Sequence, residues 1–161
     1  MIKKNSKVFV TGHKGLVGSS ILKTLKKKGF KNIITADRKQ LNLLDKNKVN
    51  YFIKSKKVEY IINCAAKVGG ILANSIKPVE FFYENIQMQN NLLLSAHKYK
   101  IKRFVFLGSS CIYPRNSLTP IRENQLLSGK LEKTNEAYAI AKISGVKLSA
   151  TAPSTICIPR D

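Results

Sequence analysis

Acidic residues are few in this sequence: 9 stand against 29 lysines and arginines, which gives a formal charge of +20. A basic surface of that size attracts polyanions in general. Sequence-specific readers of nucleic acid, however, use clustered arginines and aromatic stacking platforms, whereas here the basic residues are mostly lysines scattered along the chain. We therefore interpret the charge as a compositional bias and expect no specific nucleic-acid partner, with a general polyanion binder as the alternative.

Cysteine and histidine are also scarce. The three cysteines, Cys64, Cys111 and Cys157, are odd in number and far apart, and His13 and His97 do not complete a set with metal-ligand spacing. A disulfide framework is therefore not expected, which fits a reducing compartment. The sequence predicts no metal site.

Long apolar runs are missing as well. The first apolar segment, residues 8–10, is too short for the hydrophobic part of a signal peptide. No run approaches the roughly 18 apolar residues that a membrane helix needs. We expect a cytoplasmic protein with no membrane partner.

What the sequence does have is an alternation of apolar runs and helical periodicity. The 161 residues suit one domain with a hydrophobic core. Repeated β-α units predict an α/β protein with a Rossmann-like, doubly wound parallel sheet. Strands are expected at residues 7–11, 32–36, 60–63 and 103–108, and helices at residues 16–28, 46–56, 79–100 and 136–148.

The first strand runs directly into Gly12-His13-Lys14-Gly15-Leu16-Val17-Gly18. A strand, a glycine-rich turn and a helix form the context of a dinucleotide-binding loop, in which the helix N-terminus faces a pyrophosphate. The alternative is a purely structural turn. We assign all seven residues, Gly12 to Gly18, to cofactor binding.

The second expected strand ends at Asp37-Arg38. An acidic residue at this point binds the ribose 2′-hydroxyl and favours NAD, whereas the cations Arg38 and Lys14 favour the 2′-phosphate of NADP. Surface charges without a ligand are the plain alternative. The small residue Ala65, after the third strand, lets a cofactor lie close to the backbone.

A second candidate site begins where the fourth strand ends, at Leu107-Gly108-Ser109-Ser110. Tyr138 and Lys142 are four residues apart, so both side chains leave one face of the last helix. A nearby ammonium favours a phenolate, and a tyrosine so placed can exchange a proton near neutral pH. A serine hydroxyl beside it can hold a substrate oxygen.

The helix expected at residues 79–100 is apolar on more than one side. Such a helix is buried on two sides. One side packs on the sheet, and a second subunit is the candidate for the other. We expect a homodimer through the 79–100 and 136–148 helices.

Together these motifs resemble the extended short-chain dehydrogenase/reductase family, and within it the GDP-L-fucose synthases. The resemblance is carried by five blocks in family order, residues 12–18, 41–45, 65–71, 108–114 and 134–142. It implies NADPH as cofactor, with Asn42, Leu43, Leu107, Gly108, Ser109, Ser110 and Lys142 adding to the binding residues above. A threonine or similar residue is usual where Asp37 stands, so NADPH preference depends chiefly on Arg38 and Lys14.

The resemblance also implies a reaction. Members convert GDP-4-keto-6-deoxy-D-mannose to GDP-L-fucose by epimerising C3 and C5 and then reducing the C4 ketone. It implies that Tyr138 donates the proton, Lys142 tunes Tyr138 and holds the nicotinamide ribose, and Ser109 bonds the carbonyl oxygen. Cys111 matches the cysteine that exchanges protons during epimerisation.

The chain ends at residue 161, at about half the length usual in the family. We expect an incomplete NADP-binding Rossmann domain at residues 1–148 and an irregular, aberrant tail at residues 149–161, because two prolines and a run of serine and threonine suit neither helix nor strand. The later strands, the substrate domain and the catalytic histidine would be missing, so we expect little turnover from this chain alone. The alternatives are another sugar-nucleotide epimerase or dehydratase of the family, or a non-catalytic nucleotide-binding module.

Overall fold

The structure, a computed structural model, describes residues 2–151 and 155–158. Its centre is a parallel sheet in the order β2-β1-β3-β4-β5. The strands are β1 Val8–Thr11, β2 Ile33–Ile34, β3 Tyr60–Asn63, β4 Arg103–Leu107 and β5 Thr155–Ile158. Because every strand is parallel to its neighbours, all their carboxyl ends meet at one edge, where ligands bind in open α/β sheets.

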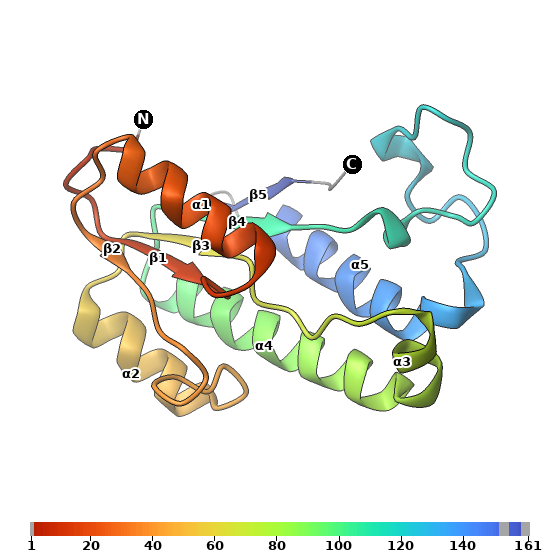
Figure 1. The fold of residues 1–161 in the computed structure, drawn as a ribbon, viewed down its shortest axis with the longest axis horizontal. Coiled ribbons are helices and arrows are strands. Elements are labelled where there is room, and N and C mark those ends of the chain that lie inside the picture. Colours follow the sequence, from red (N-terminus) through yellow and green to blue (C-terminus); the bar gives the residue numbers. More distant parts are fainter. Residues whose placement is uncertain (1, 152–154, 159–161) are drawn as a thin grey trace.

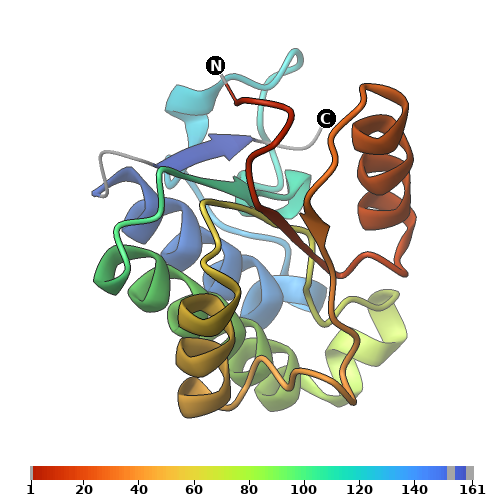
Figure 2. The ribbon, with the colours of Figure 1, turned by 90° about the vertical axis from the view of Figure 1, so that its left-hand side faces the viewer.

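Helices cover both faces of the sheet. Helix α1 lies on one face, and α2, α4 and α5 lie on the other, as the two perpendicular views show (Figures 1 and 2). The bounds are α1 Leu16–Lys27, α2 Lys46–Lys56, α3 Ile71–Ile76, α4 Pro78–Lys98 and α5 Glu136–Ala150, with short 3-10 turns η1 Ser110–Ile112, η2 Glu123–Gln125 and η3 Lys133–Asn135. This arrangement confirms the predicted Rossmann-like sheet.

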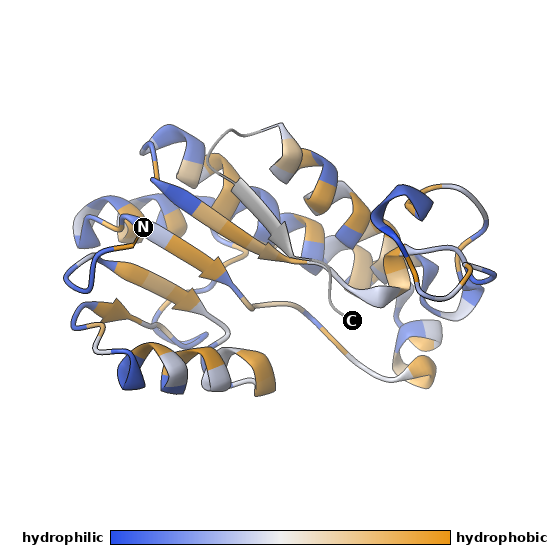
Figure 3. Ribbon diagram, turned by 90° about the horizontal axis from the view of Figure 1, so that it is seen from above, coloured by the Kyte–Doolittle hydropathy of each residue, from blue (hydrophilic) through white to orange (hydrophobic). Residues whose placement is uncertain are grey.

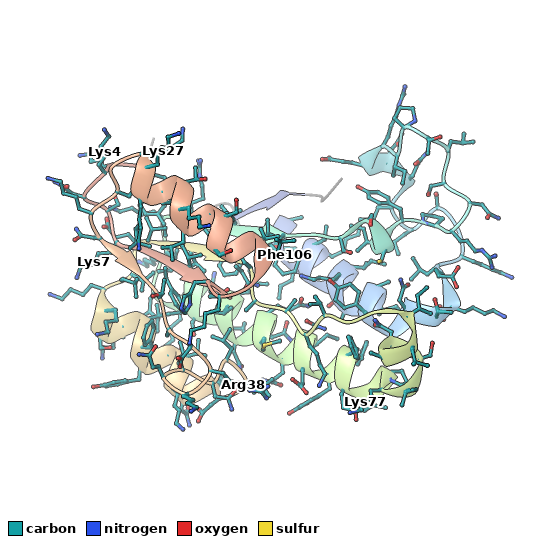
Figure 4. All side chains as sticks on the ribbon, in the orientation of Figure 1. Lys4, Lys7, Lys27, Arg38, Lys77 and Phe106 are labelled. Carbon is teal, nitrogen blue, oxygen red and sulfur yellow. The ribbon has the colours of Figure 1, made fainter. Side chains whose placement is uncertain are left out.

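The core lies between the sheet and the α2–α4–α5 layer. Phe9, Ile61, Phe104 and Phe106 of the central strands are at most 1% exposed, and the apolar colour is concentrated on these strands (Figure 3). Burying apolar surface on this scale is the main favourable term in folding. Lys4, Lys7 and Lys27 are found at the end of the molecule that holds the N-terminus (Figure 4).

Two expectations from the sequence were wrong. The helices expected from the sequence leave out the segment between Gly70 and Pro78, but it contains helix α3. There Asn74 donates to the carbonyl oxygens of Gly69 and Gly70 at 2.9 and 3.1 Å. A single six-residue helix is too short to show a period.

The second error concerns the expected irregular tail. Helix α5 continues to Ala150, and Thr155–Ile158 pairs with β4 as strand β5. Residues 155–158 are Thr, Ile, Cys and Ile, which suit a pleated conformation. The rest of the expected tail beyond Thr151, residues 152–154 and 159–161, lies outside the described residues. In the described parts of the chain, no helix is long and apolar enough to cross a membrane.

Candidate active site

A cleft of about 680 Å³ opens at the carboxyl edge of the sheet. Its walls are the loops that follow β1, β2 and β3, together with one face of α4. The lining residues are Phe9, Thr11, Gly12, His13, Lys14, Gly15, Leu16, Val17, Gly18, Ala36, Asp37, Arg38, Leu41, Asn42, Leu43, Leu44, Cys64, Ala65, Ala66, Lys67, Val68, Glu84 and Met88.

The loop after β1 is built for close backbone contact. Gly12 has a φ of +62°, and a Cβ placed there would lie 2.8 Å from the Ala65 nitrogen. A Cβ at Gly18 would lie only 2.2 Å from the Gly12 oxygen. Gly15, the N-cap of α1, has no side chain to occupy the first N–H groups of the helix. These free N–H groups at a positive helix end fit a phosphate group.

The floor of the cleft is held by Thr11. Its hydroxyl donates to Asn63 Oδ1 at 2.7 Å and accepts the N–H groups of Cys64 and Ala65 at 3.1 and 3.0 Å. Thr11 and Asn63 are at most 2% exposed. One hydroxyl therefore joins the end of β1 to the loop after β3.

The two outer walls are attached to α4 by buried amides. The Asn85 side chain accepts the Lys67 N–H at 2.8 Å and donates to the Lys67 oxygen at 2.9 Å. Asn91 donates to the Leu43 oxygen at 2.8 Å. Both amides are at most 3% exposed, so the position of α4 fixes the positions of both walls.

Charged side chains form the rim of the cleft. Lys14 Nζ lies 2.9 Å from Asp37 Oδ2, and Asp37 Oδ1 accepts the N–H groups of Lys39 and Gln40 at 3.0 Å each. The hydrogen bond from Lys14, and next the one from the Gln40 backbone, lower the pKa of Asp37 below its usual value. Asp37 therefore remains an anion whose two oxygens are both engaged within the chain.

A second ionic group lies nearby on α4. Glu84 pairs with Lys67, and Arg38 Nη2 lies 3.9 Å from Glu84 Oε2. Arg38 extends from the loop between β2 and α2 (Figure 4). Sequence reasoning missed Glu84 and Met88, which are distant in sequence from every other wall residue. For Glu84, a carboxylate in a helix with apolar residues on more than one side was the available signal, and Met88 offered none.

The candidate catalytic residues come from two elements. Strand β4 ends at Leu107, the buried Gly108 follows, and Ser109 caps η1, where its Oγ accepts the Cys111 N–H at 3.4 Å. Tyr138 and Lys142 are one turn apart on α5.

Lys142 joins these two elements. It is 5% exposed, and its Nζ donates to the Leu107 oxygen at 3.0 Å and lies 4.8 Å from the centre of the Phe106 ring. A buried ammonium needs such partners, because desolvation disfavours the charge.

Helix α5 is held against β4 by close packing. Gln89 of α4 donates to the Ala141 oxygen at 2.7 Å and to Ser144 Oγ at 2.9 Å. A Cβ at Gly145 would lie 2.4 Å from Phe106 Cζ. A glycine is therefore needed here for the helix that carries Tyr138 to pack this close to the strand.

The predicted site residues fall into two groups. Those from Gly12 to Gly18, with Arg38, Asn42, Leu43 and Ala65, line the cleft. Leu107, Gly108, Ser109, Ser110 and Lys142, which were also assigned to the cofactor, lie at the end of β4 and on α5, outside the cleft walls, beside Cys111 and Tyr138. Within the described residues, no three His, Cys, Asp or Glu side chains are grouped to hold a metal ion.

Comparison with known proteins shows to which family this architecture belongs. The model of the NAD dependent epimerase/dehydratase family matches residues 8–154. A putative GDP-L-fucose synthase 2 of Arabidopsis thaliana is 47% identical over 148 residues, 92% of this chain and 45% of that protein. The GDP-L-fucose synthase of Escherichia coli K12 is 45% identical over 142 residues, 88% and 44% of the two chains.

Solved structures agree with the sequence relatives. A GDP-D-glycero-L-gluco-heptose synthase of Campylobacter jejuni, solved in the presence of NADPH, superposes with a TM-score of 0.93 at 33% identity, covering 99% of this chain and 47% of that one. The chain thus spans about half the length of the relatives it matches. The predicted kinship with GDP-L-fucose synthases is confirmed, and the chain belongs to the NAD dependent epimerase/dehydratase family.

Proposed function

We propose that this chain is the cofactor-binding part of an NADPH-dependent enzyme that converts GDP-4-keto-6-deoxy-D-mannose to GDP-L-fucose. The observation that carries the proposal is the identity of 45–47%, over about 90% of the chain, with relatives named GDP-L-fucose synthase. The proposed unit is the incomplete NADP-binding Rossmann domain expected at residues 1–148, extended by the end of α5 and by β5.

The cleft fits NADP as the cofactor. Gly12, Gly15 and the first N–H groups of α1 would take the pyrophosphate. Lys14 and Arg38, on the rim, would take the 2′-phosphate. Asp37 already accepts hydrogen bonds from Lys14, Lys39 and Gln40. A ribose hydroxyl would have to compete with these donors, which weakens the argument for NAD.

The reduction needs a proton as well as the hydride that NADPH supplies when bound. As the C4 ketone becomes an alkoxide, Tyr138 gives its phenolic proton to that oxygen and becomes a phenolate. Lys142, fixed by the Leu107 oxygen and the Phe106 ring, stabilises the phenolate. Ser109 holds the same substrate oxygen through a hydrogen bond.

The epimerisation needs a proton donor and acceptor beside C3 or C5. The ketone makes these C–H bonds acidic, and we assign Cys111 to the exchange. Since the chain spans about 45% of the length of these relatives, we expect little turnover by the 161-residue chain alone. A different GDP-sugar ketone is the second candidate, favoured by the 33% identity with the GDP-heptose synthase.

The cofactor part of the proposal is tested by titrating the purified chain with NADPH and NADH and following nicotinamide fluorescence. We expect saturable binding of NADPH, with NADH bound at least about tenfold more weakly, the effect of about 1.4 kcal/mol from lost phosphate contacts. A folded chain, by circular dichroism, that binds neither nucleotide would overturn the proposal. RNA titrated in parallel tests the polyanion alternative.

The proposal includes a second copy of the chain as partner and a cytoplasmic location. Helices α4 and α5 run side by side (Figure 1). Both carry apolar side chains that a neighbouring subunit would cover, namely Phe82, Leu94, Ile140 and Leu148, which are 39, 52, 42 and 37% exposed.

A further inference from the structure

Asn135 occupies a capping position without capping. It is the last residue of η3 and the N-cap of α5, and asparagine is among the strongest N-cap residues. Within the described residues its side chain makes no capping hydrogen bond. Instead, its Nδ2 donates to Cys111 Sγ at 3.3 Å.

The rest of the amide is also poorly satisfied. Asn135 Oδ1 is buried and has no hydrogen-bond partner in the described part of the chain. Buried polar atoms are normally paired, and leaving one unpaired is unfavourable. The Asn135 side chain thus forms a hydrogen bond to the sulfur while it leaves the helix uncapped and its own oxygen unpaired. Locally unfavourable arrangements of this kind are found at functional sites.

The contact joins the two elements of the candidate catalytic site. Cys111 lies on η1, which also follows Ser109, and Asn135 lies three residues before Tyr138 at the start of α5. Helix α5 packs against η1. A single hydrogen bond thus sets the place of the sulfur relative to the helix that carries the tyrosine.

We infer that Asn135 is a positioning residue for Cys111: its amide N–H holds the sulfur beside α5 and stabilises the thiolate when the proton leaves. An N–H donor forms a stronger hydrogen bond to a charged acceptor than to a neutral one. The proton-exchange role of Cys111 rests on the proposed function, but the hydrogen bond to the sulfur does not.

The test is the rate at which iodoacetamide alkylates Cys111 at a fixed pH of 7.5. The thiolate attacks the CH₂ carbon, a C–S bond forms, and iodide leaves. Mass spectrometry of the Cys111 peptide gives the rate, and the Cys64 peptide of the same molecule is the internal control. Three variants are compared: N135A, N135S, whose shorter side chain can cap α5 without reaching the sulfur, and N135D, which keeps the shape but loses the donor.

We expect all three variants to alkylate Cys111 roughly 3- to 10-fold more slowly than the native chain, since each loses the N–H donor that holds the attacking sulfur. Cys64 should change by less than about twofold. A native rate in N135S, which removes the donor without adding a charge, would overturn the inference. Slowing in N135A alone would assign Asn135 to capping. NADPH titration of the same samples reports separately on the proposed function.

Discussion

At the scale of single residues, the cleft depends on positions where no side chain fits. Gly12 has a positive φ, and a Cβ there would meet Ala65 and Cys64 at 2.8 Å. Positive φ is readily adopted by glycine alone. The glycine spacing was readable from the sequence because this requirement is local to the loop.

Replacement of Gly12 by alanine is expected to lower the free energy of unfolding by roughly 1–3 kcal/mol, through strain at positive φ, and to abolish NADPH binding. Denaturant unfolding and fluorescence titration measure the two effects. Gly70→Ala is the matched control, since a Cβ at Gly70 meets nothing within 4 Å. Equal effects of both substitutions would contradict this account.

Asp37 leads to a second prediction at this scale. Asp37→Asn removes the charge that holds Lys14 while keeping an oxygen for Lys39 and Gln40. Lys14 is then available to the 2′-phosphate, so NADPH should bind about two- to fivefold more tightly, as expected for an exposed ion pair. Isothermal titration with 2′,5′-ADP and 5′-AMP measures the change. Weaker binding of 5′-AMP with unchanged binding of 2′,5′-ADP would show that Asp37 acts on the ribose instead.

At the scale of elements, the amino ends of three strands are joined by one carboxylate. Glu59 lies just before β3. Its carboxylate accepts the N–H of Lys7, the residue before β1, at 2.9 Å, and it pairs with Lys102, the residue before β4. The side-chain hydrogen bond from Lys102, and next that from the Lys7 backbone, lower the pKa of Glu59 below 4.5.

Because the folded-state pKa of Glu59 is the lower one, its stabilisation is fully present above pH 4.5 and is lost as the pH falls through the folded value. Glu59→Gln should therefore lower the urea midpoint more at pH 7 than at pH 3. Urea unfolding at both pH values gives the comparison. An equal loss at pH 3 would assign the effect to shape instead of charge.

Helix α5 gives the other prediction for an element. Alanine is normally the better helix former by about 1 kcal/mol, but a Cβ at position 145 would lie 2.4 Å from Phe106 Cζ and 2.7 Å from Gln89 Oε1. Gly145→Ala should thus destabilise the fold by about 1–3 kcal/mol through overpacking. Thermal unfolding shows whether the substitution lowers or raises the Tm. A rise in Tm would mean that α5 and β4 are less closely packed.

Most of the elements could be predicted from the sequence, but the side-chain contacts that join them could not. Alternating β and α patterns predicted β1, β3, β4 and the helices α1, α2 and α4, since periodicity is a local property. The amides of Asn85 and Asn91, which hold Lys67 and Leu43, and the Asn135–Cys111 contact join residues 18 to 48 positions apart. Such contacts have no local pattern and appear only when the chain is folded.

At the scale of the whole molecule, the proposed dimer is open to a direct test. Leu94→Glu with Ile140→Glu places charges on the exposed sides of α4 and α5, where they would be buried by a second copy. The molar mass measured by light scattering after size exclusion should change from that of a dimer to that of a monomer. Leu118→Glu, in the loop at residues 114–131 and 78% exposed as leucine, should leave the mass unchanged. A monomeric native chain would refute the dimer.

The strand order has a consequence for how the chain is made. After β2 has joined β1 on one side, the sheet extends on the other side in the order of synthesis, through β3, β4 and β5. No later strand has to enter between two that are already paired, so each can join as it leaves the ribosome. A growing chain therefore presents one advancing edge at a time, first on β1, then on β3, then on β4. A chaperone that protects nascent chains would have two edges to cover, this advancing one and the outer side of β2, which is an edge strand throughout.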